Sequence, residues 1–426
     1  MNIVRKLRTG QQRAVLGLWQ RCASKDQSKN PPKNPPKDQA KNQPKGQPQN
    51  QSKEQSKNQS KDCGQLQASN VCGKSGESSK GTGKPSGKGS DKAKAADKRR
   101  KVTMIDGDGV GPELTKAVQE VCCAAKVPIE WDIFHEHRAA DSEDVSPQLL
   151  ESLCGNRIGI AGPIKSHLWA DKLRKELNQY AYVSVCKHLE GQESPYGKID
   201  CVIVRDQFEG EYSGIEHRVV PGVMQTIKVS TFEGSTRLAK FVFRYALKEK
   251  RKKITVAHKA NIMQLTDGNF LEAMHAEADK HVQEVRFEER YLDTVCLNML
   301  MRPAINDVLV SSSMYGDVIS TIGGSMMGGI GMCPGYAVSP KGQLYNCQIT
   351  PRDDMAGKDL VNPTGFLLAT VLMLRELELH DHASRIQCAI ETLYKDSELR
   401  TQDLGGEAKC SEFVHALCEL LISQNG

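Results

Sequence analysis

The chain has 426 residues, of which 26% are charged and 38% are hydrophobic, and its formal net charge is +6. Its first 100 residues hold 23 Lys and Arg against 7 Asp and Glu, so this part is strongly basic and the remaining 326 residues carry a net charge of −10. That acidic part is long enough for one large or two modest domains, and it offers no basic footprint for nucleic acid. No run of residues approaches the roughly 18 apolar residues of a membrane span.

The cysteine spacing favours buried thiols in a reducing compartment. Fourteen cysteines are present, and none of them forms a Cys-x-x-Cys pair. The spacing therefore predicts neither a zinc site nor a disulfide framework.

Residues 1–25 are rich in Arg and Lys and contain no acidic residue. Apolar residues such as Leu7, Val15 and Leu18 can be gathered on one helical face. This pattern is typical of a mitochondrial transit peptide, and it predicts import into the matrix; a disordered basic terminus is the alternative.

Residues 26–100 are of low complexity, with Lys recurring among Pro, Asn, Gln, Ser and Gly. Nothing here can form a packed core, so we predict a disordered linker. The Lys-rich tail could also bind RNA or an anionic surface, but it has no interleaved aromatic residues for base stacking, and this alternative is less favoured.

The folded part is predicted to begin with a strand over 102–105 and a Gly-rich turn over 106–111. A helix follows, with Pro112 in its first turn and a helical apolar repeat over 113–125. Strands and helices then alternate, which predicts the α/β class. An alternating strand around 226–230 suggests a smaller second domain. The further predicted strands are 157–161, 182–185, 200–204 and 253–257, and the further helices are 171–179, 235–250, 268–280 and much of the chain after 363.

The segment 307–329 predicts a strand, a turn and the start of a helix. Asp317 is expected at the carboxyl end of a strand, where open α/β sheets place their ligands. Thr321 lies four residues later on the same helical face. A second Asp at that position would create a divalent-cation site, but the residue there is a neutral hydroxyl.

Three other segments place charged or phenolic groups after predicted strands or before the strand at 307. They contain Arg205 and Tyr212, Lys259, and Asp293. Each could by itself be a salt-bridged surface residue, and for single residues this alternative is equally favoured.

Together with 106–113, Tyr315-Gly-Asp317 and 356–364, these segments resemble the isocitrate/isopropylmalate (β-decarboxylating) dehydrogenase family. The resemblance covers 101–426 and is closest to the mitochondrial NAD-dependent isocitrate dehydrogenases, in particular to their catalytic alpha-type subunits. It implies a discontinuous large α/β domain over 101–179 and 328–426, and a smaller α/β domain over 180–327 that makes the subunit contacts. It also implies an active site that a neighbouring subunit completes.

The resemblance implies oxidation of isocitrate by NAD to 2-oxoglutarate and carbon dioxide, with Mg²⁺ or Mn²⁺, in an oligomer of isocitrate dehydrogenase subunits. Each candidate site residue takes its role from the resemblance. Tyr212 and Lys259 would move protons, Arg174 and Arg205 would bind substrate carboxylates, Asp293 and Asp317 would hold the metal, and Asp354 and Asn362 would line the adenosine end of the cofactor site.

The sequence departs from the family pattern around this site. Leu168 and Ala170 replace a Ser and an Asn, Ser184 replaces an Arg, Thr321 replaces the second metal-binding Asp, and Ile349 falls on a family His. Fewer anionic ligands weaken a hard-cation site, and lost Arg–carboxylate contacts weaken substrate binding. Three hypotheses therefore remain: a subunit active in its own right, a weakened paralogue with a regulatory or structural role in the same oligomer, and, less favoured, a protein that binds nucleic acid or a surface through its Lys-rich tail.

Overall fold

The computed structural model describes residues 99–135 and 144–423. The predicted transit peptide and nearly all of the predicted linker lie outside these residues. Within the part that is described, no helix is both long and apolar enough to cross a membrane.

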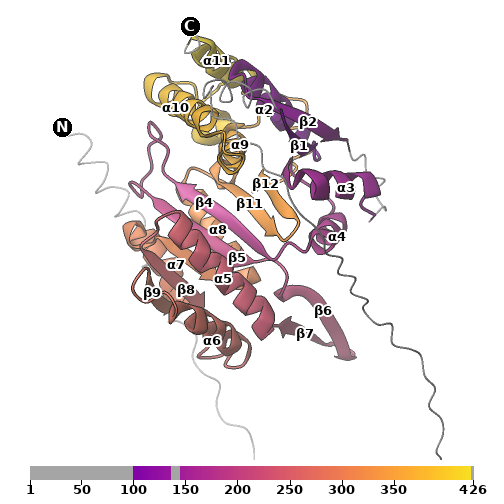
Figure 1. Cartoon of the computed structure of the whole chain (residues 1–426), viewed down its shortest axis with the longest axis vertical. Coiled ribbons are helices and arrows are strands. Elements are labelled where there is room, and N and C mark those ends of the chain that lie inside the picture. The colour runs from indigo at the N-terminus through magenta and orange to yellow at the C-terminus, as the bar shows by residue number, and fades with distance from the viewer. Residues whose placement is uncertain (1–98, 136–143, 424–426) are drawn as a thin grey trace, which may run out of the picture. The chain divides into compact units, whose positions relative to one another are not determined.

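A ten-stranded mixed sheet runs through the fold in the spatial order β2-β1-β3-β12-β11-β4-β5-β10-β8-β9 (Figure 1). Three neighbouring pairs are antiparallel: β12 with β11, β11 with β4, and β4 with β5. On the outer sides of this group, β12 pairs in parallel with β3, and β5 pairs in parallel with β10. The remaining neighbours are parallel. The strands are β1 (Arg100–Ile105), β2 (Ile129–Phe134), β3 (Ile158–Ala161), β4 (Ala181–Lys187), β5 (Asp200–Asp206), β8 (Lys253–His258), β9 (Arg286–Tyr291), β10 (Val308–Ser311), β11 (Pro334–Ser339) and β12 (Gly342–Cys347).

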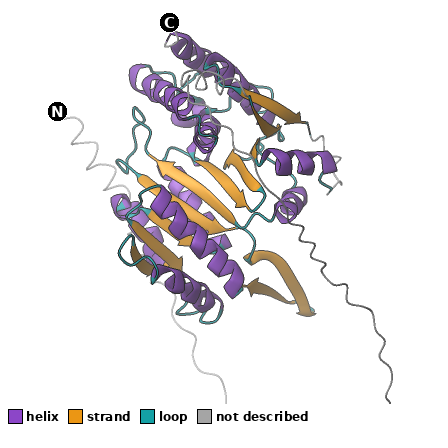
Figure 2. Ribbon diagram, in the orientation of Figure 1, coloured by secondary structure: helices purple, strands orange, loops and turns teal. Residues whose placement is uncertain are grey.

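Helices cover both faces of this sheet (Figure 2). On β5, Val202 and Val204 join the hydrophobic cluster that contains α5 and α6, whereas Ile203 joins the cluster on the opposite face. A strand buried on both faces is apolar at successive positions, which explains the continuous hydrophobic runs. The helices are α2 (Gly111–Ala124), α3 (Pro147–Asn156), α4 (His167–Leu177), α5 (Phe232–Lys248), α6 (Thr266–Ala278), α7 (Leu292–Met301), α8 (Ser313–Met326), α9 (Thr364–Glu376), α10 (His380–Asp396) and α11 (Cys410–Ser423).

A separate two-stranded sheet is formed by β6 (Gly210–Val220) and β7 (Val223–Val229). The two strands are joined by Pro221 and Gly222, and Gly222 has a φ of 87°, which suits glycine in a tight turn. The sequence predicted the second strand of this hairpin but not the first. The β6 strand is largely exposed, so its residues carry little hydrophobic signal.

Two predicted element boundaries need correction. The helix α8 begins at Ser313, directly after the strand, so no separate turn precedes Asp317. The first strand begins at Arg100 rather than 102, inside the predicted linker. The predicted division into two domains stays a prediction; its boundary falls between β11 and β4, which pair with each other in the one sheet.

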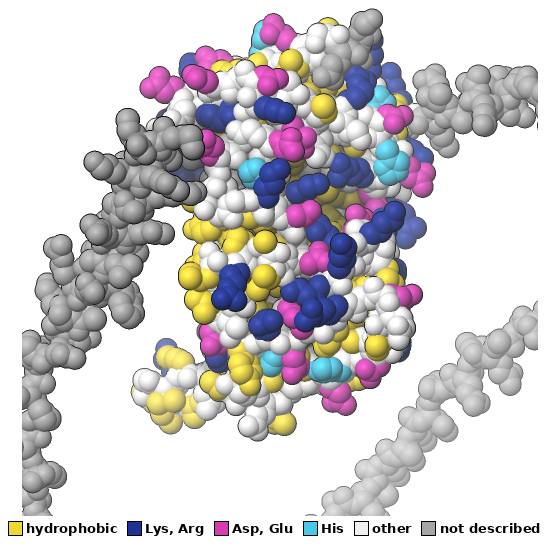
Figure 3. Space-filling model, turned by 90° about the vertical axis from the view of Figure 1, so that its left-hand side faces the viewer, with side chains coloured by type: hydrophobic (Ala, Val, Ile, Leu, Met, Phe, Trp, Pro, Cys, Tyr) yellow, Lys and Arg dark blue, Asp and Glu magenta, His cyan; other side chains and the backbone are white. Residues whose placement is uncertain are grey.

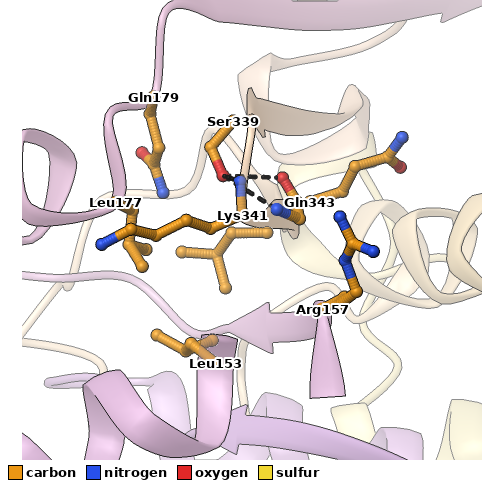
Figure 4. A pocket seen from close by; sticks show the side chains of 9 residues that line it. Leu153, Arg157, Leu177, Gln179, Ser339, Lys341 and Gln343 are labelled. Atoms are coloured by element: carbon orange, nitrogen blue, oxygen red, sulfur yellow. Dashed lines mark hydrogen bonds between the residues drawn. The ribbon is translucent and has the colours of Figure 1, made fainter. Parts of the chain in front are cut away.

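The turn between β11 and β12 encloses a small cavity of about 10 Å³ (Figure 4). Its Ser339 hydroxyl accepts hydrogen bonds from the backbone N–H groups of Lys341 and Gly342. The Lys341 ammonium donates to the carbonyl of Glu176 over 2.7 Å. A space of this size holds at most one water, so we regard it as a structural junction between α4 and the hairpin.

Candidate active site

The sheet topology brings Arg205 and Asp317 together. Arg205 lies near the carboxyl end of β5, where it is in register with Ser311 at the end of the parallel neighbour β10. Asp317 follows on α8. A Cβ added to Gly316 would lie 2.3 Å from the Cβ of Arg205, so only glycine before Asp317 allows this close approach.

The carboxylate of Asp317 is contacted from two sides. Its Oδ2 accepts a hydrogen bond of 2.9 Å from the Tyr212 hydroxyl, and its Oδ1 lies 3.3 Å from Nη1 of Arg205. The guanidinium of Arg205 also lies 4.9 Å above the ring of Tyr182. Partial burial, reinforced by the hydrogen bond to Asp317, raises the pKa of Tyr212 to about 12. Tyr212 is therefore a protonated donor at neutral pH.

Arg174 lies close enough to this group to interact with its charges. Burial lowers the pKa of Arg174, the charge of Arg205 acts in the same direction, and the charges of Asp171 and Asp317 oppose both. Its Nη1 donates to Asp171 over 2.8 Å. Direct contacts thus join Arg205, Tyr212 and Asp317, and the charge of Arg174 acts on them from α4; we call these four residues the Asp317 cluster.

Lys259 and Asp293 form a second pair. The Lys259 ammonium donates to Oδ1 of Asp293 over 2.8 Å, and this hydrogen bond lowers the pKa of Asp293. The Asp293 side chain is 68% exposed. Across 99–135 and 144–423 we find no hydrogen bond or ion pair that joins this pair to the Asp317 cluster. That this exposed pair reaches the site of a neighbouring subunit stays a prediction.

A buried charge network holds Lys259 in place, and the sequence did not predict it. The ammonium of Lys228 lies 2.7 Å from Asp267 and 3.1 Å from Glu211, with side-chain exposures of only 10%, 3% and 17%. The second oxygen of Asp267 accepts from the backbone N–H of Lys259 over 2.7 Å. Lys228 also lies 4.3 Å from the ring centre of Tyr315. The only sign of this network in the sequence was the position of Lys228 in the alternating strand. Asp267 lies in none of the motifs that the sequence analysis identified.

The residues of one chain do not fit a resident divalent cation. Both oxygens of Asp317 already contact Arg205 and Tyr212, and the Thr321 hydroxyl donates to the Asp317 carbonyl over 2.9 Å. Among the described residues, no group of three or more His, Cys, Asp or Glu side chains is arranged to hold a metal ion. Hard cations need several oxygen ligands, and a single occupied carboxylate does not provide them.

A pocket of about 410 Å³ suits the adenosine end of a dinucleotide. Ile349, Arg352, Asn362 and Asp403 line it, together with backbone from 328–331. Asn362 is buried, and its side-chain amide donates to Asp403 over 3.0 Å. Asp354 is held outside the lining by two hydrogen bonds from Arg352, of 2.8 and 2.7 Å.

The Gly-rich turn shapes one wall of this pocket. A Cβ on Gly109 would lie 1.7 Å from the carbonyl oxygen of Pro351, and Gly109 has a φ of 59°. The adjacent N–H of Val110 donates to the same carbonyl over 2.9 Å, and Val110 lines the pocket. The turn thus fixes the 349–351 loop by close backbone packing.

The sequence analysis placed the departures from the family pattern around one site. In the structure, these residues do not all face one open cleft. Ser184 is 1% exposed, and its hydroxyl accepts a hydrogen bond of 3.0 Å from Gln348. The same Gln348 amide donates to Ser320. Gln348 therefore fills the interior beside Ser184, whereas Leu168 is 60% exposed and Ile349 lines the 410 Å³ pocket.

The sequence is similar to known dehydrogenases along its folded part. The model of the family described as isocitrate/isopropylmalate dehydrogenase matches residues 101–417. The chain is 45% identical over 331 residues to the "Probable isocitrate dehydrogenase [NAD] subunit alpha, mitochondrial" of Drosophila melanogaster, which covers 76% of this chain and 88% of that protein. It is 41% identical over 327 residues to the "Isocitrate dehydrogenase [NAD] subunit alpha, mitochondrial" of Homo sapiens. That match covers 74% of this chain and 89% of that protein.

The fold is similar to a solved structure of the same kind. The crystal structure of isocitrate dehydrogenase from Methylococcus capsulatus superposes with a TM-score of 0.71 at 31% sequence identity. The match covers 76% of this chain and 99% of that chain.

Proposed function

The chain belongs to the isocitrate/isopropylmalate dehydrogenase family, and from this premise we propose that it is a subunit of a mitochondrial NAD-dependent isocitrate dehydrogenase. The reaction is the oxidation of isocitrate to 2-oxoglutarate and carbon dioxide. The observation that carries the proposal is the Asp317 cluster, in which a phenol, a guanidinium group and a carboxylate from different elements are in contact, and the charge of a second guanidinium group, Arg174, acts on them. The relatives of this chain support NAD as the oxidant and the mitochondrion as the compartment, and within it we propose the matrix.

The arginines of the cluster are suited to hold the substrate's carboxylates. Nε of Arg205 is buried and has no hydrogen-bond partner among the described residues. A buried unpaired donor costs about 1–3 kcal/mol, so a ligand that accepts from it gains affinity. Planar guanidinium groups bind carboxylates through two parallel hydrogen bonds, which also fixes the orientation of the substrate.

Tyr212 and Lys259 are the proton-transfer groups of the proposal. The raised pKa of Tyr212 keeps its hydroxyl protonated, so it can donate a proton to a carbanion-like carbon after carboxylate loss. Lys259 is held by Asp293 and by the backbone hydrogen bond to Asp267, and we place its ammonium in the site of a neighbouring subunit. When bound, NAD supplies the acceptor for the hydride of the substrate's carbinol carbon.

A second candidate function is supported by the loss of metal ligands. Thr321 uses its hydroxyl within the helix, and Asp317 is covered by its two partners. We therefore also propose, as the alternative, that this chain is a weakened paralogue that helps to complete the site of another subunit. Any Mg²⁺ or Mn²⁺ would then depend on ligands from two chains.

Two exposed apolar faces are suited to subunit association. Figure 3 shows hydrophobic side chains gathered on one face of the molecule, next to several Lys and Arg side chains. Exposed apolar patches commonly mark protein interfaces. The α7–α8 face consists of Leu297, Leu300, Met301, Met314 and Val318, and the second surface is the β6–β7 hairpin, whose two sides carry Ile215, Val219, Val220, Val223, Met224 and Ile227.

The experiment compares the purified full chain alone with the chain mixed with alpha-type isocitrate dehydrogenase subunits. NADH formation is followed with isocitrate and Mn²⁺. Turnover by the chain alone supports the active subunit and contradicts the weakened paralogue. Turnover only in the mixture, above that of the other subunits alone, supports the weakened paralogue. No binding to other subunits and no turnover would contradict both.

A further inference from the structure

An open groove of about 1170 Å³ lies between the end of α4 and the first half of α5. It shares no residue with the Asp317 cluster or with the 410 Å³ pocket. Pockets for small ligands commonly measure about 300–1,000 Å³, so this groove has room for a sizeable molecule. Four cationic residues line it, and we call them the groove cations: Lys175, Arg237, Lys240 and Arg244.

The groove cations lack acidic partners. Across the described ranges, none of the four has a carboxylate oxygen within 4 Å, although two acidic residues, Glu209 and Glu233, also line the groove. Glu209 accepts hydrogen bonds from the backbone N–H and the hydroxyl of Thr231, which also lines the groove. With four cationic and two acidic residues in its lining, the groove carries a net positive charge, in contrast to the net acidity of residues 101–426.

Three of the groove cations follow one face of α5. Arg237, Lys240 and Arg244 are separated by three and four positions, a spacing that places helical side chains next to one another. Like charges at this spacing repel and destabilise a helix slightly. An anion bound between them would relieve the repulsion.

A hydrogen bond and two aromatic rings fix the position of the Arg237 guanidinium, which can bind an anion. Its Nη1 donates to Asn178 over 3.1 Å, and its guanidinium carbon lies 4.6 Å from the ring centre of Tyr180 and 6.0 Å from that of Phe208. Its Nε is buried and has no partner in the described part of the chain. A guanidinium fixed in this way loses little entropy when it binds a phosphate.

We propose that the α4–α5 groove binds a small polyanion that carries at least two phosphate groups. The phosphates lie between Arg237 and the exposed ends of Lys175 and Lys240. Phe208 and Phe232, which are 45% and 47% exposed at the rim, provide apolar surface for an organic group attached to the phosphates. The site is separate from the proposed chemistry and binds without turnover.

The test measures binding of inorganic pyrophosphate to the full chain by calorimetry at ~0.15 M salt, where weak surface electrostatics are screened. The variant Lys175→Gln/Lys240→Gln removes two exposed groove cations, and we expect affinity to fall about tenfold or more. The matched control Lys116→Gln/Lys248→Gln removes the same charge from exposed lysines outside the groove. We expect the control to stay within about twofold, and the basic tail is common to all variants.

Hydrogen exchange locates the ligand, and we expect pyrophosphate to protect 231–241. A nucleoside diphosphate, added with NAD at saturation to fill the cofactor pocket, tests the organic group. Tighter binding that Phe232→Ala abolishes identifies an organic diphosphate, whereas equal binding identifies the phosphate groups as the whole ligand. The proposal is overturned if pyrophosphate shows no saturable binding, or if the groove variant binds as the control does. Because no step requires isocitrate, these outcomes are independent of the proposed activity.

Discussion

At the scale of single residues, Asp317 is the centre of the candidate site. The Asp317 carboxylate contacts a guanidinium and a phenol, and the helical position one turn later is occupied by Thr321. The cluster thus retains groups for binding carboxylates and donating a proton. It lacks the second carboxylate that would hold a cation.

Tyr212→Phe removes the hydroxyl that Asp317 accepts from. In the assembled enzyme we expect 2-oxoglutarate formation to fall by roughly 10²–10⁴-fold, the usual effect of losing a general acid. Because the pKa of Tyr212 is about 12, its titration should not appear in the pH–rate profile below about pH 10. Tyr196→Phe, at an exposed tyrosine outside the cluster, is the control. Equal rates for the two variants would remove Tyr212 from the mechanism.

Thr321→Asp restores a carboxylate one turn after Asp317. If Asp317 faces a cation site in the oligomer, we expect Mn²⁺ affinity, measured by electron paramagnetic resonance, to rise about tenfold or more, since anionic ligands tune such sites. Ser325→Asp adds the same charge one turn further along α8 at another exposed position. A similar change in both variants would show only a general effect of charge.

At the scale of elements, the neighbouring strands β8 and β9 are linked by a partly buried carboxylate. Glu288 receives hydrogen bonds or ion pairs from Lys253, Thr255 and Arg290. Burial alone would raise the pKa of Glu288, but these contacts outweigh it and lower the pKa to about 2. The ionised form is therefore the form that stabilises this edge of the sheet.

Glu288→Gln should lower the free energy of unfolding by about 1–3 kcal/mol at pH 7, measured by urea denaturation. A lowered folded-state pKa contributes stability above the unfolded value, near 4.5, and this contribution is lost as the pH falls toward 2. The difference between wild type and variant should therefore shrink across that range. Glu289→Gln, at the more exposed neighbouring carboxylate, should cost less than about 0.5 kcal/mol. A difference that does not change with pH would refute the assignment.

At the scale of the molecule, one sheet joins segments from both ends of the described chain. The carboxyl ends of β5 and β10 place the Asp317 cluster, and Lys259 and Asp293 follow the carboxyl ends of the next two parallel strands, β8 and β9. A single subunit thus presents two sets of chemical groups that no hydrogen bond or ion pair joins within the described residues. Association of subunits is the step that would combine them.

Leu297→Asp/Val318→Asp places two charges on the α7–α8 face. We expect sedimentation to show a smaller assembly, because burying unpaired carboxylates in an apolar interface is unfavourable. Ile422→Asp on α11 changes an equally exposed apolar residue, 59% against 60% for Leu297, and should leave the assembly unchanged. An unchanged assembly in both variants would place the subunit interface on another surface.

Much of the element order followed from sequence alone. Apolar runs predicted the buried strands, and Pro112 marked the start of a helix, because these signals depend on neighbouring residues. The sequence missed β2, β6, β9, β11 and β12 as strands; of these, β2, β6 and β9 are largely exposed or mixed and have weak patterns. It also missed α3 and α7, and the apolar residues of α7 surround the helix rather than forming one stripe.

The candidate residues came from sequence, but their partners came from the tertiary structure. The motifs singled out Tyr212, Arg205 and Asp317 without showing that the first two bind opposite oxygens of the third. Lys228 and Asp267 are 39 positions apart and meet only because the hairpin packs against α6. Hydrogen bonds and ion pairs act over a few ångströms, and only the folded chain brings residues so distant in sequence within that range.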